Sequence, residues 1–259
     1  MLGTYALMGL PVSVPLLVAA GCGAAVVYGA DRVLVAAPED RWNRPDRVAW
    51  VRAHRRWLMG EGVFLAGAGG AALLSLRPST IAGAVLLGGM AGLHQWRGGV
   101  FGGRGAGGAT GLAKPVGIAV VWAVGSTALP MVEAGAMRPG PLAWLVGYRT
   151  LFVLANVLLS DWGDRRGDQA AGLHPWSRGV RAGRLRGGVT ALLVVTLGVA
   201  VGGVGLGVPS GLLLIDAIGP MLLLGGAWTL TPAASAHRLV LDLIVAWPAV
   251  TAAVAWGIG

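Results

Sequence analysis

The sequence has few charged residues and a single cysteine, and both shortages narrow the class of protein. Only 12% of its 259 residues are charged, which is about half the share of a typical soluble domain. Cys22 has no second cysteine to pair with, so an intrachain disulfide and a cysteine-based metal site are both excluded. We expect Cys22 to be a small buried packing residue, because it lies inside an apolar run.

Apolar residues and glycine make up most of what is present. Hydrophobic residues account for 55% of the chain, there are 45 glycines, and the mean hydropathy is +0.71. A single core surrounded by water has no use for this much apolar sequence, whereas a bilayer does. Glycine is also common where transmembrane helices pack closely. The composition therefore predicts an all-α, polytopic membrane protein.

Eight apolar runs are candidates for membrane-spanning helices, which need about 20 residues, and the third of them is short. They cover roughly 5–29, 57–75, 79–94, 112–131, 140–160, 186–206, 209–230 and 237–257. We predict one transmembrane helical bundle that forms a single domain over residues 1–259. Pro11 and Pro15 fall in the first run, where proline ends or kinks a helix. That run is long and has no basic segment before it, so we expect no cleavable signal peptide.

The basic residues predict how this bundle is oriented. Most of the 20 lysines and arginines fall in the loops 31–56, 95–114 and 161–186, which eight spans put on one side of the membrane. The positive-inside rule makes that side cytoplasmic in a multi-pass protein of a bacterial-type inner membrane. The same rule accounts for the net charge of +9. No nucleic-acid-binding motif accompanies these residues, so we expect no nucleic-acid partner.

Three aspartates follow the fifth apolar run. Asp161, Asp164 and Asp168 are spaced three and four residues apart, which puts them on one face if the helix continues. A hard divalent cation such as Mg²⁺ would relieve the repulsion between them. The alternative is a solvated loop in which Arg165 and Arg166 balance the acidic charge.

Around these aspartates, residues 155–176 read ANVLLSDWGDRRGDQAAGLHPW. This segment resembles the second aspartate motif of the UbiA superfamily of intramembrane prenyltransferases, with Asp164 and Asp168 at its DxxxD positions. The segment that starts at Lys114 resembles a lysine-led helix of that family, and residues 237–248 resemble its last helix. Members typically have nine helices, so eight would correspond to loss of the first. The first aspartate motif departs from the family pattern, because only Asp31 stands there and Glu39 and Asp40 follow eight and nine residues later.

The resemblance implies Mg²⁺-dependent transfer of an isoprenyl group from a polyprenyl diphosphate to an aromatic or other small acceptor in the membrane. It implies catalytic roles for Lys114 and Asp31, and it assigns diphosphate binding to Arg165, Arg166 and Lys114. The implied metal ligands are Asp161, Asp164, Asp168, Asp31, Glu39 and Asp40. Two alternatives stay open, namely a terpene cyclase of the same superfamily and a non-catalytic, lipid-binding membrane scaffold.

Two further acidic residues, Asp216 and Asp242, lie inside apolar runs. An ionisable group within a membrane is costly and is usually paired or functional. Asp242 lies about one helical turn after His237 and Arg238, which makes those residues its expected partners. Arg149 also lies within an apolar run.

Overall fold

The computed structural model describes residues 1–30, 32–33, 40–100, 111–172, 176–232 and 234–258. In those residues the regular elements are helices, and no strand occurs among them. The longer helices, in chain order, are α2 (Val14–Ala30), α5 (Arg55–Leu73), α6 (Pro78–Val100), α7 (Ala113–Glu133), α8 (Pro139–Ala170), α9 (Ala182–Gly202), α10 (Ser210–Thr229), α11 (Ser235–Val245) and α12 (Pro248–Ile258). The shorter ones are α1 (Leu2–Met8), α3 (Asp40–Asn43), α4 (Pro45–Ala53) and the 3₁₀ helix η3 (Val204–Leu206). The predicted all-α class is confirmed for this part of the chain.

These helices group into two compact units. Unit 1 comprises Met1–Val12, Leu112–Gly163 and Gly179–Gly259, and unit 2 comprises Ser13–Gly111 and Asp164–Arg178. The long helix α8 belongs to both, because its residues up to Gly163 lie in unit 1 and those from Asp164 onwards lie in unit 2. That residues 1–259 form one domain stays a prediction.

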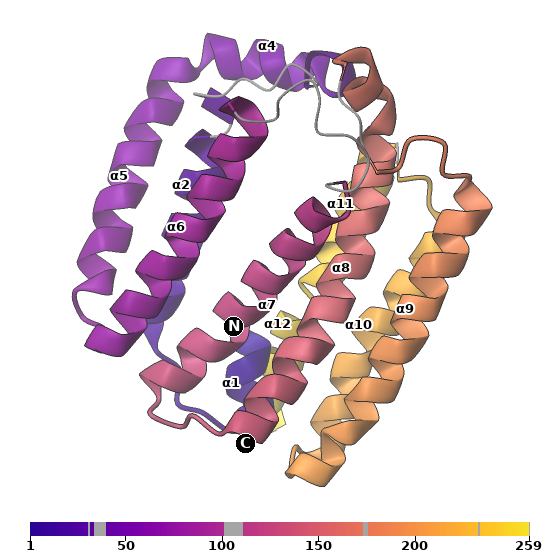
Figure 1. Cartoon of the computed structure of the whole chain (residues 1–259). Coiled ribbons are helices and arrows are strands. Elements are labelled where there is room, and N and C mark those ends of the chain that lie inside the picture. The colour runs from indigo at the N-terminus through magenta and orange to yellow at the C-terminus, as the bar shows by residue number, and fades with distance from the viewer. Residues whose placement is uncertain (31, 34–39, 101–110, 173–175, 233, 259) are drawn as a thin grey trace. The chain divides into compact units, whose positions relative to one another are not determined.

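In unit 1, α9 packs along α10, and the short helix α1 packs on α12 and also touches α7 and α10 (Figure 1). A buried apolar cluster joins α1, α8, α9 and α10, and its members are Leu7, Leu145, Tyr148, Ala200, Val208 and Leu213. At the edge of this cluster the indole N–H of Trp144 donates a hydrogen bond of 2.7 Å to the carbonyl of Val199. Trp144 therefore ties the first turns of α8 to the end of α9.

In unit 2, α2 packs closely against α5 and makes a smaller contact with α6 (Figure 1). Gly69 allows the close approach of α5 to α2, because a Cβ there would lie 2.9 Å from the Cβ of Cys22. Cys22 is half-buried and unpaired in this contact. Small residues at a helix–helix contact are what close packing in a membrane requires.

Several described helices have the length and composition of membrane spans. The segments Ala113–Glu133, Pro139–Ala170, Ala182–Leu206 and Ser210–Thr229 qualify individually, and α11 and α12 together form a fifth candidate that is bent by 49°. Large apolar side chains such as Phe64, Val201 and Leu214 are more than 70% exposed. Apolar surface of this kind marks contact with lipid or another apolar partner. The long apolar helices thus indicate a membrane protein, with four or five candidate spans among the described residues.

The structure does not show the eight predicted spans, and the first predicted run is wrong as a single helix. The run 5–29 is interrupted after α1, where Gly9 adopts a left-handed φ of 61° and the N–H of Leu10 bonds back to the carbonyl of Tyr5 at 2.9 Å. Pro11 follows and cannot continue the helix. The remaining helix α2 has 17 residues, about 25 Å, which is short for a hydrocarbon core of about 30 Å.

The run 57–75 corresponds to α5, and its charged residues weaken it as a candidate span. The helix begins with Arg55 and Arg56 and carries Glu61, so its uninterrupted apolar stretch is shorter than the helix itself. The run 79–94 corresponds to α6, of which Pro78–Gly92 is apolar but short. Helices therefore form where the sequence predicts them, while eight membrane crossings stay a prediction.

The contact between Trp144 and α9 predicts a difference between two nearby glycines. Replacing Gly203 with alanine puts a Cβ 2.4 Å from Cζ2 of Trp144, and overpacking of this kind costs about 1–3 kcal/mol. We expect Gly203→Ala to lower the thermal unfolding midpoint in detergent by roughly 2–4 °C per kcal/mol. Gly205→Ala is the control, because no atom lies within 4 Å of its added Cβ. Equal unfolding midpoints for the two variants would contradict this packing.

Candidate functional site

The last three turns of α8 carry the predicted carboxylate residues. This helix has 32 residues and continues through Asp161, Asp164 and Asp168 to Ala170. At about 100° per residue the three side chains fall within an arc of roughly 60°. All three aspartates are half-buried. One face of α8 therefore carries three acidic groups close to the helix end, and we call it the carboxylate face.

A second side of α8, centred roughly 110° away around the helix axis, carries glycines in close contacts. Gly163 lies against the chain between α10 and α11, where an added Cβ would stand 2.7 Å from the carbonyl oxygen of Pro232. The guanidinium of Arg238 donates to the same oxygen at 3.2 and 3.3 Å. Because Gly163 has no side chain, α8 comes close to this connection within unit 1.

Gly167 makes the corresponding close contact in unit 2, and its neighbour is Asn43. The Nδ2 of Asn43 donates to the carbonyl of Asp164 at 3.1 Å, and the N–H of Gly167 donates to Asn43 Oδ1 at 3.1 Å. A Cβ on Gly167 would lie 2.2 Å from Asn43 Cγ. The side-chain amide of Asn43 therefore lies directly on the α8 main chain, at the turn that carries Asp164 and Asp168.

Trp162 is also on this part of α8, within unit 1. Its indole N–H donates to the carbonyl of Val180 at 3.1 Å, two residues before α9 begins. Although Trp162 is next to Asp161 in the sequence, its polar atom is engaged with the main chain. We assign it to anchoring the segment that leads into α9.

About one and a half turns before the carboxylate face, α8 makes a polar contact with α11. The Nδ2 of the buried residue Asn156 donates to Oδ1 of Asp242 at 3.4 Å. The expected partners of Asp242 have other contacts, since His237 Nδ1 accepts from the N–H of Thr231 at 2.9 Å and Arg238 donates to Pro232. The expectation that Asp242 is partnered is confirmed through Asn156, which the sequence did not indicate, and pairing with His237 or Arg238 stays a prediction.

The cationic residues predicted to bind diphosphate lie on two helices. Arg165 and Arg166 follow Asp164 directly on α8, and Arg165 is half-buried while Arg166 is exposed. Lys114 is the second residue of α7 and is exposed. Arg165 lies next to the carboxylate face in helical rotation, about 40° from Asp161. Arg165 is therefore closer than Arg166 to the three aspartates in helical rotation.

The predicted first metal motif is described only at its end. Asp31 and Glu39 lie outside the described residues, and Asp40 is the first residue of α3. The carboxylate of Asp40 forms an ion pair with Arg47 of α4. A carboxylate paired in this way has its charge compensated by the chain itself. Its role as a metal ligand stays a prediction.

The donor set on α8 suits a hard divalent cation, although no ready-made cage exists in the described part of the chain. There, no three histidine, cysteine, aspartate or glutamate side chains come together closely enough to hold a metal ion. Side chains three or four residues apart on a helix are about 5–6 Å apart at Cβ. Mg²⁺ is usually held by one or two carboxylates together with water and substrate phosphates. The carboxylate face fits this shared mode of binding.

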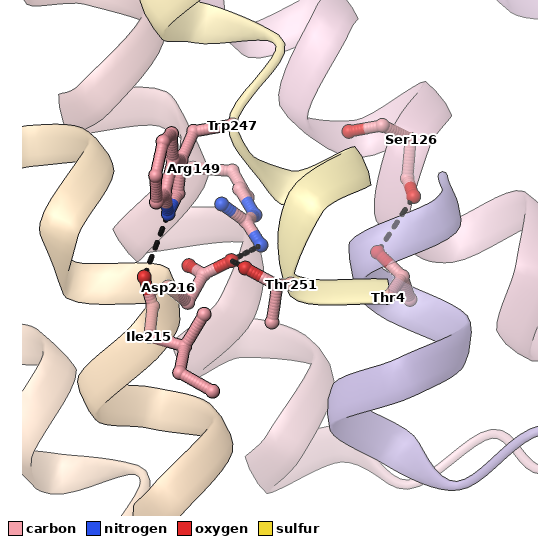
Figure 2. A network of polar contacts seen from close by, with 7 residues as sticks. All are labelled: Thr4, Ser126, Arg149, Ile215, Asp216, Trp247 and Thr251. Carbon is pink, nitrogen blue, oxygen red and sulfur yellow. Dashed lines mark hydrogen bonds and ion pairs between the residues drawn. The ribbon is translucent and has the colours of Figure 1, made fainter. Parts of the chain in front are cut away.

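A separate polar cluster lies deeper along α8, within unit 1. Asp216 of α10 accepts from Arg149 Nη2 at 2.9 Å and from Thr251 Oγ1 of α12 at 3.0 Å. Figure 2 shows these three side chains pointing toward one another, with the Trp247 indole bonded beside them to the carbonyl of Ile215. Arg149, Asp216 and Thr251 are at most 5% exposed.

This ion pair confirms the expectation that Asp216 is partnered, and it identifies Arg149 as the partner. Arg149 precedes Asp164 by 15 residues, which is about 22 Å along a helix. The pair is therefore too distant to contact a metal ion or a diphosphate group bound at Asp164. It joins α8, α10 and α12 inside unit 1, and α1 lies close by, because a Cβ on Gly3 would be 3.0 Å from Arg149 Nη2.

The fold and the polar residues define a class: a helical membrane protein whose longest described span ends in a three-carboxylate face. Comparisons with protein-family models, curated proteins and solved structures found no match to this chain. Assignment to the UbiA superfamily therefore stays a prediction that rests on residues 155–176 and the weaker resemblances of two other segments.

Proposed function

We propose that this protein transfers an isoprenyl group from a polyprenyl diphosphate to a small acceptor within the membrane, in an Mg²⁺-dependent reaction. The single observation that carries the proposal is the carboxylate face, in which Asp161, Asp164 and Asp168 lie at the end of an apolar helix of 32 residues. In a prenyl diphosphate, the charged head matches the carboxylate end of this helix, and the apolar tail matches the apolar part before it.

The residues of α8 are suited to holding the diphosphate head. Asp164 and Asp168 supply hard oxygen ligands, and when Mg²⁺ is bound it neutralises charge on the departing diphosphate. Arg165 and Arg166 carry guanidinium groups that donate charge-assisted, often bidentate, hydrogen bonds to phosphate oxygens. The phosphate-binding role of Lys114, on α7, stays a prediction from the resemblance.

The apolar part of the helix is suited to the prenyl tail. Residues on α8 before the carboxylate face are mostly apolar, and the half-buried ones, such as Leu154, Val157 and Leu158, keep apolar surface for a prenyl tail. An allylic cation formed after the diphosphate leaves is quenched by water, so a dry apolar surrounding protects it. The products would then depend on what else is bound, an acceptor or none.

A second candidate function is a non-catalytic, lipid-binding scaffold. The observation that favours it is the ion pair between Asp40 and Arg47, because a carboxylate already neutralised by arginine has less need of a metal. This candidate predicts binding of prenyl diphosphates without cleavage.

The test is diphosphate release from geranylgeranyl diphosphate by the purified full chain in lipid nanodiscs, with Mg²⁺ and with EDTA. The proposal predicts Mg²⁺-dependent release and, when candidate acceptors are added, a prenylated product. A cyclic hydrocarbon or alcohol as the sole organic product would assign the protein as a cyclase instead. Binding without release, across several donor lengths and acceptors, would contradict the proposal and favour the scaffold.

A further inference from the structure

We propose that Asn43 is a positioning residue for the carboxylate face. Its side-chain amide holds the α8 main chain at the turn from Asp164 to Gly167, and so fixes the directions in which Asp164 and Asp168 present their carboxylates. The inference rests on the proposed function for its purpose, which is metal and diphosphate binding at these two residues. It concerns a residue that contacts the main chain of α8 and touches no reacting group.

The contact requires a side chain with both a hydrogen-bond donor and an acceptor, and asparagine has both. The amide donates through Nδ2 to one peptide carbonyl, that of Asp164, and accepts through Oδ1 from one peptide N–H, that of Gly167, both at 3.1 Å. Aspartate keeps the acceptor but has no donor, and alanine has neither. Asn43 is half-buried, so water competes less for these two bonds than at an exposed site.

The two peptide groups that Asn43 engages belong to the turn that carries the carboxylates. In an α-helix the carbonyl of residue 164 faces the N–H of residue 168, and the N–H of residue 167 faces the carbonyl of residue 163. Asn43 therefore bonds to one peptide group from each of the two neighbouring main-chain hydrogen bonds, 167 to 163 and 168 to 164. A shift of the amide changes the backbone on which both aspartate side chains depend.

Gly167 completes the arrangement from the α8 side. An added Cβ would lie 2.2–2.3 Å from Cγ, Oδ1 and Nδ2 of Asn43, so any larger residue expels the amide. Asn43 is the last residue of α3, and Pro45 starts α4 two residues later. The ion pair from Asp40 to Arg47 links the same two short helices. The amide is thus presented by a short segment held at both ends.

The experiment measures metal binding directly, in the full-length protein and without catalysis. Mn²⁺ is titrated in the presence of inorganic pyrophosphate and followed by electron paramagnetic resonance, for wild type, Asn43→Ala, Gly167→Ala and the double variant. We expect each single variant to weaken Mn²⁺ binding by about 10–100-fold, the usual effect of losing a group that orients a metal ligand. The double variant should be no weaker than the singles, because both remove the same contact.

Two controls separate positioning from folding. Gly147→Ala is a glycine replacement on the same helix with no atom within 4 Å of the added Cβ, and we expect it to bind Mn²⁺ like wild type. Asn43→Asp keeps the acceptor for Gly167, so it should fold and bind with intermediate affinity even if Asn43→Ala folds poorly. Unfolding midpoints are measured without metal, so that affinity is compared only among folded variants.

Unchanged Mn²⁺ affinity in folded Asn43→Ala or Asn43→Asp, or additive losses in the double variant, would overturn the inference. A wild-type protein that binds no Mn²⁺ with pyrophosphate would overturn it as well, since there would be no site to position. Weakened binding in these variants, together with no cleavage of prenyl diphosphates by wild type, would support the positioning role and overturn the proposed function alone.

Discussion

Replacing Asp164 or Asp168 with asparagine is expected to lower Mg²⁺-dependent diphosphate release by about 10²-fold or more, the range seen when one preorganised charge-stabilising group is lost. Asparagine has nearly the same size as aspartate, so the helix and its contacts are kept while the negative charge is removed. The measurement is the initial rate of diphosphate release in nanodiscs at saturating Mg²⁺ and again at low Mg²⁺. The loss should be larger at low Mg²⁺, because a weaker site requires more metal.

The matched control for this pair is Asp46→Asn. Asp46 is an exposed aspartate in the first turn of α4, and removing its charge should leave the rate unchanged. Full activity in both Asp164→Asn and Asp168→Asn would show that the carboxylate face takes no part in the reaction. An equal loss in Asp46→Asn would point to a general effect of net charge.

The second large effect is expected at the buried ion pair. Changing Arg149 to methionine leaves Asp216 charged, buried and without its cationic partner, and breaking a buried pair in this way costs about 3–5 kcal/mol. Asp216→Leu should be comparably destabilising, because it leaves the Arg149 guanidinium in an apolar surrounding. The measurement is thermal unfolding in nanodiscs without substrate or metal.

The variant in which both Arg149 and Asp216 are replaced tests directly whether the two residues form a pair. Replacing both partners with apolar residues of similar size is often close to neutral, so Arg149→Met combined with Asp216→Leu should recover much of the stability lost by either change alone. Arg138→Met, at an exposed arginine one residue before α8, should lie within about 0.5 kcal/mol of wild type. Wild-type stability in Arg149→Met would contradict the pairing.

The sequence predicted the features that depend on local pattern, namely the positions of several helices and the shared face of the three aspartates. Apolar runs of about 20 residues match α7 and α10 to within two residues at each end, and the run 186–206 overlaps α9 with an offset of four residues. The match is good because length and hydropathy are local properties. The spacing of Asp161, Asp164 and Asp168 indicated a shared helix face, and α8 continues far enough to carry all three. The single span expected over 5–29 is wrong because Gly9 and Pro11 interrupt it, and a proline in an apolar run does not by itself distinguish a kink from the end of a helix.

Contacts between residues that are far apart in the chain could not be predicted from the sequence. Asn43 and Asp164 are 121 positions apart, and Arg149 and Asp216 are 67 apart. Charged residues in apolar runs did signal that Asp216 needed a partner, but the choice of Arg149 depends on how α8 packs on α10. Nothing in the spacing of Asn43 distinguishes it from an ordinary loop residue. The glycine at 167, between two predicted ligands, was the available hint of a close approach.

The proposed metal site is tested most directly by locating the bound metal ion in a crystal structure. Crystals of the full chain grown with Mn²⁺ and a non-cleavable prenyl thiodiphosphate would be measured at the manganese absorption edge. The proposed function predicts an anomalous peak about 2 Å from a carboxylate oxygen of Asp164 or Asp168, with the diphosphate oxygens completing the coordination. Manganese and diphosphate bound away from α8, with both aspartates free of metal, would contradict it.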